Sequence, residues 1–217
     1  MRTFTDTEKR FIGTASLIAF SFIFFAFFEQ TNSLNSIVQG FIIATIFFFG
    51  LPLVYCRYVL DEPLSQLGIQ STQHVKAILW SVLSAFFGFL IVWGLGNIYP
   101  QIADQTVFPV LVESHFGWFV LYALFGIPVT LLVYEVFFRG MVQYLWLGNS
   151  WKAFGFQAVF FWLLLWLSEG ISFSAIPLLI TPILSGLVVK QTSSLWYAWL
   201  TSSLFIFLTD VLFLSLR

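Results

Sequence analysis

The sequence predicts an all-α membrane protein, a polytopic bundle of about seven transmembrane helices. Of its 217 residues, 59% are hydrophobic and only 9% are charged, and the mean hydropathy is +0.94. A soluble domain of this size would carry roughly 25% charged residues, so this chain has too little polar surface to face water on all sides. We therefore expect an integral membrane protein whose first partner is the lipid bilayer.

Seven apolar runs approach the roughly 20 residues that a helix needs to cross the hydrocarbon core. They span residues 11–28, 37–56, 77–99, 116–138, 153–167, 171–189 and 194–216. The fifth run is short, and Pro177 and Pro182 are expected to weaken or break the sixth, so the count is fixed only to within one span. No repeat or low-complexity linker divides the chain, and we expect a single integral membrane domain over residues 1–217.

The basic residues support this count because cytoplasmic connections carry most of the Lys and Arg of a membrane protein. With seven spans, eight of the nine basic residues fall on one side and only Arg217 falls on the other. We therefore expect a cytoplasmic N-terminus and an outside C-terminus. The longest cytoplasmic connection, residues 57–76, is predicted to lie on the membrane interface through Leu60, Leu64, Leu67 and Ile69.

Composition also argues against several kinds of site. The net charge of -1 gives no support for a nucleic-acid partner. Cys56 is the single cysteine, so an internal disulfide cannot form. The two histidines, His74 and His115, fall on opposite sides of the membrane in the expected topology and cannot share a metal or a water. We expect no metal and no cofactor.

The fourth span carries one charged pair, Glu135 and Arg139. A charge at the centre of a span costs about 2.5–3.5 kcal/mol to insert and is a functional-site hypothesis by default. The two residues also stand four apart with the glutamate first, which favours an intrahelical ion pair. Arg139 lies near the predicted cytoplasmic end, where a long side chain can extend to the interface. The pattern leaves a structural and a functional reading open.

The segment YEVFFRGMVQ (134–143) resembles the first motif of the CPBP family, the CAAX-protease and bacteriocin-processing (Abi) membrane proteins. That motif has two adjacent glutamates, three residues and Arg-Gly, with a preceding Pro and a following Gln. The matching residues here are Pro128, Glu135, Phe138, Arg139, Gly140 and Gln143. LSQLGI (64–69) resembles the family's Leu-Gly-Leu/Ile segment before a span, and PILSGLVVKQTSSLWYAWL (182–200) resembles its Gly-rich helix, short basic turn and Ser-Leu-Trp start of the last motif helix, so the resemblance covers about residues 60–210.

Active members of this family are glutamate-dependent intramembrane endopeptidases, and the resemblance implies where their catalytic groups would stand. The first glutamate and a histidine activate a water, while a second histidine and an Asn or Asp hold the oxyanion. These positions are occupied here by Tyr134, Leu165, Ser202 and Ile206. We therefore expect no catalytic residues, a former active-site cavity lined by these four side chains, and Glu135–Arg139 kept as a structural ion pair.

These expectations favour a catalytically inactive CPBP-type protein of a bacterial cytoplasmic membrane. It would act by binding, as a scaffold, regulator or bacteriocin immunity factor for a membrane or cell-envelope protein. One alternative is a CAAX-type endopeptidase that uses Glu135 as its base, although moving one position rotates a side chain about 100° around a helix. The other alternative is a small permease-like or lipid-binding bundle, which an intramembrane charge pair also fits.

Overall fold

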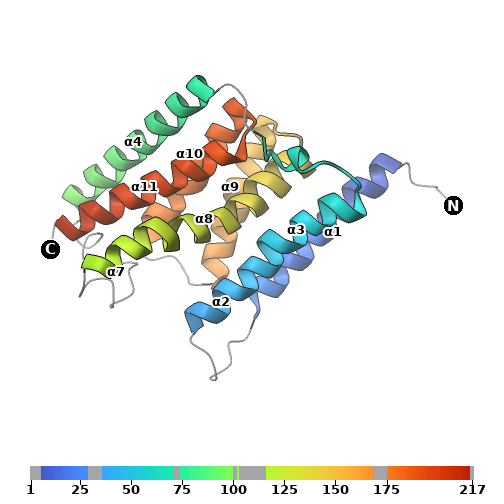
Figure 1. Ribbon diagram of the computed structural model, residues 1–217, viewed down its shortest axis with the longest axis horizontal. Coiled ribbons are helices and arrows are strands. Elements are labelled where there is room, and N and C mark those ends of the chain that lie inside the picture. The colour runs from blue at the N-terminus through green and yellow to red at the C-terminus, as the bar shows by residue number, and fades with distance from the viewer. Residues whose placement is uncertain are drawn as a thin grey trace.

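The computed structural model confirms an all-α polytopic bundle (Figure 1). It describes residues 6–28, 36–70, 74–99, 102, 116–168 and 175–215, and these residues form helices and no strand. Five of the helices are long and apolar enough to cross a membrane, and two shorter apolar helices cover Trp151–Leu167 and Ile176–Thr192. The chain is therefore an integral membrane protein by the length and composition of its helices.

The first three predicted spans correspond to three helices. Helix α1 covers Asp6–Ala26, and α4 covers His74–Ile98. Between them, one continuous helix is built from α2 (Ser36–Ala44), η1 (Thr45–Gly50), α3 (Leu51–Val54) and η2 (Tyr55–Val59). Its η1 and η2 segments have the wider π-helical hydrogen bonding.

The fourth helix continues beyond the apolar run 116–138 predicted as its span. It runs through α7 (Phe116–Leu121), η4 (Tyr122–Gly126), α8 (Ile127–Glu135) and η5 (Val136–Trp146). The apolar stretch of this helix has 30 residues, Gly117–Trp146. The η5 segment is π-helical over 11 residues, whereas most π-helical segments are single-turn bulges that often mark functional sites. The charged pair stands where α8 passes into η5.

The last three predicted spans correspond to the helices α9 (Trp151–Ser168), α10 (Ile176–Thr192) and α11 (Leu195–Ser215). The expected break at the prolines does not occur: α10 is one continuous helix that contains both Pro177 and Pro182. Pro177 lies in its first turn, where a missing N–H costs nothing. Helix α9 also braces α10 near Pro182, since the Gln157 side-chain amide donates to the Pro182 carbonyl at 2.8 Å.

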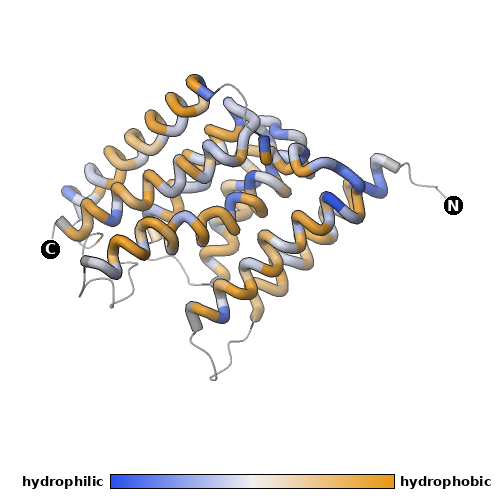
Figure 2. The backbone as a smooth tube through the Cα atoms, in the orientation of Figure 1, coloured by the Kyte–Doolittle hydropathy of each residue, from blue (hydrophilic) through white to orange (hydrophobic). Residues whose placement is uncertain are grey.

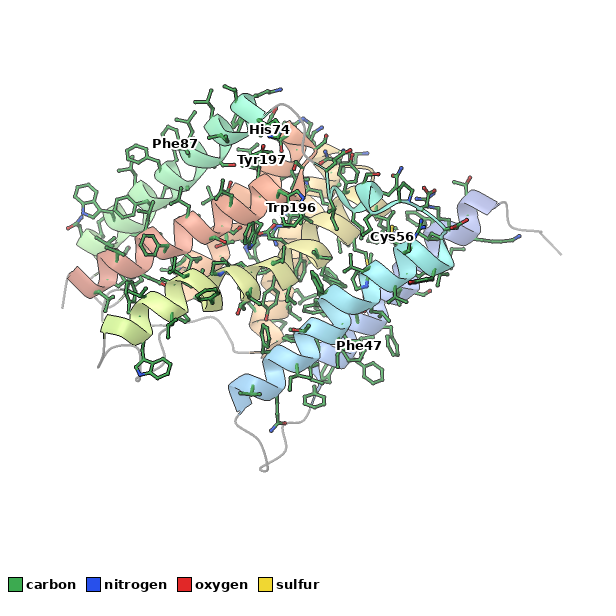
Figure 3. The ribbon with its side chains drawn as sticks, in the orientation of Figure 1. Phe47, Cys56, His74, Phe87, Trp196 and Tyr197 are labelled. Atoms are coloured by element: carbon green, nitrogen blue, oxygen red, sulfur yellow. The ribbon has the colours of Figure 1, made fainter. Side chains whose placement is uncertain are left out.

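The fourth span lies between two groups of helices. Helix α1 and the α2–α3 helix lie side by side at one edge of the bundle, and α4 and α11 lie at the other (Figure 1). Of the two larger buried clusters, one joins α1, η1, η5 and α9, and the other joins α4, α8, α10 and α11. Helix surfaces turned away from these clusters are apolar, as Phe87 on α4 illustrates (Figure 3). Hydrophilic positions occur mainly at one end of the bundle and at its middle (Figure 2).

The connection after η2, which was predicted to lie on the membrane interface, packs against the end of the bundle. Its short helix η3 (Leu64–Leu67) is docked into the bundle, with Leu67 fully buried and Leu60 and Ile69 half-buried. Gly68 has a positive φ of 74° and its carbonyl accepts a 2.8 Å hydrogen bond from the N–H of Leu195. The connection therefore packs against the start of α11 because its backbone turns inward at this glycine.

Three connections meet at this same end of the bundle. The Arg10 guanidinium of α1 pairs with the Glu62 carboxylate at 2.7 Å. The Gln70 amide donates to the Tyr144 hydroxyl at 3.2 Å and to the Ser193 carbonyl at 3.3 Å. Residues 57–70, 147–150 and 193–194 thus form one surface, which we call the loop end.

Candidate functional site

The Glu135 carboxylate is enclosed by the bundle. Glu135 is the last residue of α8 and is 1% exposed. The Ser202 hydroxyl of α11 donates to its Oε1 at 2.6 Å, and the Arg139 Nε lies 3.2 Å from its Oε2. A hydrogen bond to an ionised group is typically worth about 1.5–3 kcal/mol, so the carboxylate joins α8 firmly to α11.

The Arg139 side chain turns inward to neighbouring helices. It is 1% exposed, and its Nε donates to the Ser185 hydroxyl of α10 at 2.8 Å. Its guanidinium carbon lies 5.3 Å from the centre of the Phe161 ring of α9, within the range of a cation–π interaction. The pair therefore connects the fourth span to α9, α10 and α11.

Several atoms of this polar group have no hydrogen-bond partner among the described residues. They are Oε2 of Glu135, both terminal nitrogens of Arg139, and the side-chain oxygens of Gln143 and Gln157. An unpaired polar group buried in protein costs about 1–3 kcal/mol. Apart from Oε2 of Glu135, these buried atoms are donors and acceptors that the ion pair itself does not use. They could serve as hydrogen-bond partners for a water or a small polar group.

A second polar network extends from the same helix toward the loop end. The Gln143 amide donates at 3.0 Å to both the Gly186 carbonyl of α10 and the Asn149 side chain. Asn149 in turn donates to the Val189 carbonyl at 3.2 Å. A side chain at Gly186 would force its neighbours to shift, because a Cβ there would lie 2.3 Å from the Gln157 amide nitrogen and 3.0 Å from the Phe154 ring.

The motif glycine that follows Arg139 has a packing role. A Cβ on Gly140 would lie 3.0 Å from the Leu67 carbonyl oxygen and 3.1 Å from a Leu195 methyl. The absence of a side chain lets η3 and the start of α11 approach η5 closely. Arg139 thus supplies a buried cation, and Gly140 allows η5, η3 and α11 to pack closely together.

The four positions predicted to line a former active-site cavity fall in different surroundings. The Tyr134 ring contacts Phe48 and Phe161, with centroids 5.8 and 6.0 Å apart, and Leu165 belongs to the same buried cluster. Ile206 belongs to the other cluster. Ser202 contacts the charged pair, because its hydroxyl donates to the Glu135 carboxylate.

Tyr134 and Glu135 face opposite groups of helices, as the rotation of one helical position predicts. Tyr134 faces η1 and α9, and Glu135 faces α11. Sequence reasoning missed two partners of the pair, Ser185 and Phe161. Both stand inside apolar runs, and a serine within a span is too common in helix packing to signal a partner for a buried arginine.

The remaining polar candidates stand apart from this site. The His74 ring nitrogen lies 2.6 Å from the Tyr197 hydroxyl (Figure 3), and His115 is outside the described residues. Asp210 of α11 is buried, and one of its oxygens has no hydrogen-bond partner in the described part of the chain. Among the described residues, no group of three His, Cys, Asp or Glu could hold a metal ion.

Comparison with known proteins gives no match: no protein-family model, no curated protein and no solved structure is similar to this chain.

Proposed function

We propose that this chain is a catalytically inactive CPBP-type membrane protein that acts by binding a membrane or cell-envelope protein as a scaffold, regulator or immunity factor. One observation carries the proposal: the Glu135 carboxylate is buried and occupied by contacts from its own bundle. Ser202 holds one of its oxygens at 2.6 Å, and Arg139 faces the other at 3.2 Å. The glutamate acts as a structural tie between helices.

A hydrolytic base needs a different setting. Its carboxylate must reach a water or the substrate within hydrogen-bond distance, and donors must face the oxyanion that develops. The groups beside the Glu135 carboxylate are the Ser202 hydroxyl and the Arg139 guanidinium. Ser202 belongs to α11, and Arg139 lies one turn further along the same helix. His74, the histidine among the described residues, bonds to Tyr197. These contacts support a binding role over peptide hydrolysis.

The loop end supports a protein partner. Tyr58 and Val59 are 80% and 67% exposed there, and Leu64 is exposed as well. Exposed apolar groups of this kind, mixed with polar side chains such as Asp61, are typical of protein–protein contacts. Because Leu67 and Gly68 fix η3 to the bundle, this surface is presented rigidly. In the proposed topology the loop end and the N-terminus lie in the cytoplasm.

Crosslinking and co-purification test the proposal. A tagged wild-type protein is crosslinked in native membranes, solubilised gently and analysed by quantitative mass spectrometry beside Tyr58→Lys. We expect one partner at near-stoichiometric yield with the wild type and a loss of at least tenfold with Tyr58→Lys. The matched control is Phe87→Ala, which changes an exposed aromatic on α4 and should retain the partner.

A wild-type protein that is recovered alone would contradict the proposed binding role. Equal recovery of one partner with wild type and Tyr58→Lys would keep a binding role but place the contact away from the loop end.

A further inference from the structure

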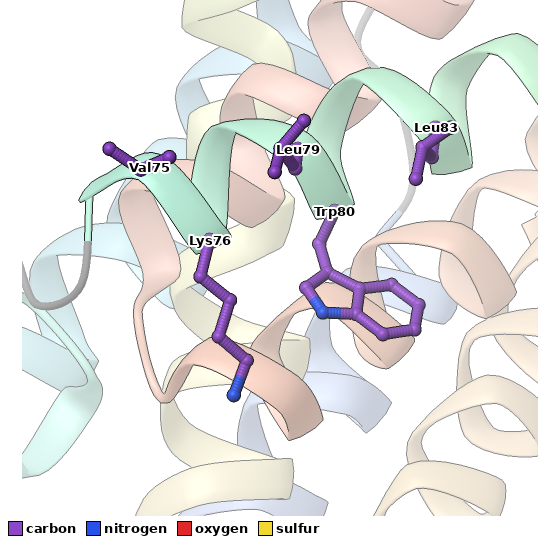
Figure 4. A pocket seen from close by; sticks show the side chains of 5 residues that line it. All are labelled: Val75, Lys76, Leu79, Trp80 and Leu83. Atoms are coloured by element: carbon purple, nitrogen blue, oxygen red, sulfur yellow. The ribbon is translucent and has the colours of Figure 1, made fainter.

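A shallow groove runs along the exposed side of α4 near the loop end. It has a volume of about 470 Å³ and is lined by Val75, Lys76, Leu79, Trp80 and Leu83 (Figure 4). These residues form two rows of side chains with a spacing of four, which are the ridges of an α-helix surface. Lys76 and Trp80 extend on one side, and the three aliphatic side chains follow the other (Figure 4).

The groove begins at the expected depth of the lipid headgroups. Helix α4 has 25 residues and is about 37 Å long, whereas the hydrocarbon core is about 30 Å thick. Its first turn, which contains Lys76, therefore reaches the polar interface. Trp80 lies one turn deeper, about 6 Å along the axis, at the level where tryptophan is enriched in membrane proteins.

The cation of Lys76 is available to a ligand. Within the described residues it is exposed and has no ion-pair partner. By contrast, Arg10 at the same end is paired with Glu62, and Lys190 lies 5.7 Å from the Trp151 ring. A free lysine at a membrane surface attracts anionic lipids, and basic pockets on transmembrane helices bind their headgroups.

The wall of the groove is held in place by the bundle. Trp80 packs against a buried cluster of Ala77, Val188 and Tyr197. Tyr197 is fixed in turn by its 2.6 Å contact with His74. The indole therefore forms a rigid side to the groove, while Val75, Leu79 and Leu83 offer an apolar surface to an acyl chain.

We propose that this groove binds one anionic phospholipid. Its phosphate would lie against the Lys76 ammonium, and one acyl chain would lie between the aliphatic row and Trp80. The charge selects an anionic headgroup, and the apolar lining selects a lipid over a free phosphate. This inference does not depend on the proposed function of the bundle.

Native mass spectrometry tests the proposal on the full-length protein in detergent micelles. Phosphatidylglycerol and phosphatidylcholine with identical acyl chains compete for binding at equal concentrations. We expect the wild type to retain phosphatidylglycerol preferentially, and Lys76→Gln to reduce that preference about fivefold, which corresponds to about 1 kcal/mol for one lysine at a membrane surface. Lys152→Gln, which changes another exposed lysine, in the first turn of α9 next to the loop end, should keep the preference.

Two further variants separate charge from shape. Lys76→Arg should keep the preference, and Leu79→Trp, which fills the groove without changing charge, should reduce lipid retention. Equal preference in the wild type and Lys76→Gln would overturn the proposal, and so would a loss caused equally by Lys152→Gln. If free glycerol phosphate displaces the lipid, the acyl chain plays no part and the groove assignment is wrong.

Discussion

Replacing Glu135 by glutamine isolates the charge of the buried pair with almost no change in shape. The glutamine oxygen can still accept the hydrogen bond of Ser202, which is 2.6 Å long in the wild type. The change therefore removes chiefly the negative charge beside Arg139. The guanidinium keeps its bond to Ser185 and its contact with the Phe161 ring, but it has no counter-charge.

The expected loss is large because the site is buried. Breaking a buried ion pair by removing one partner typically costs about 3–5 kcal/mol, whereas replacing both partners by neutral groups is often nearly neutral. Adding Arg139→Met to Glu135→Gln should therefore recover most of the loss. Ser185 remains satisfied in that double variant, because its hydroxyl also donates to the Thr181 carbonyl at 2.9 Å.

The assay is reversible unfolding of the purified protein in mixed micelles, followed by circular dichroism as the fraction of denaturing detergent rises. The wild type, Glu135→Gln, Arg139→Met and the double variant form a mutant cycle. We expect each single variant to be less stable than the double variant, with a coupling of about 0.5–3 kcal/mol or more. A single variant within about 0.5 kcal/mol of the wild type, or strictly additive losses, would refute the structural role.

Two further substitutions report on neighbouring contacts. Ser202→Ala removes a hydrogen bond to a buried carboxylate, and we expect a loss of about 1.5–3 kcal/mol in the same unfolding assay; an unchanged transition would show that the 2.6 Å contact with Glu135 contributes nothing. Gly186→Ala places a methyl 2.3 Å from the Gln157 amide, and overpacking of this kind costs about 1–3 kcal/mol. Gly155→Ala is its control, since a Cβ there meets nothing within 4 Å, and equal stability of the two alanine variants would contradict the packing argument.

The fold could be predicted largely from composition and apolar runs. Seven runs became seven helices because a span is specified by hydrophobic length, which is a property of the sequence alone. The prolines of α10 were misjudged because sequence does not show which neighbours brace a helix. The connection 57–76 was predicted to lie on the interface because of its leucines, and the sequence did not show that Gly68 turns it inward so that Leu67 is buried in the bundle.

The candidate site was predictable only in part. The spacing of Glu135 and Arg139 indicated an ion pair, and the structure places their charged groups 3.2 Å apart. The direction of Arg139 was not predictable, because a long side chain near a span end can turn either way and only the packing of Ser185 and Phe161 decides it. The likeness of the surrounding motif to the CPBP family stays a prediction.

The most direct test of the central claim is a search for peptide bond cleavage by the protein in lipid nanodiscs. Wild type and Glu135→Gln are incubated with prenylated peptides ending in a CAAX sequence and with a membrane-derived peptide library, and new termini are counted by mass spectrometry. We predict the same background of termini for both proteins, because Ser202 donates to one oxygen of the Glu135 carboxylate and the Arg139 guanidinium lies 3.2 Å from the other. New termini that appear with the wild type and disappear with Glu135→Gln would contradict the account and establish Glu135 as a catalytic base.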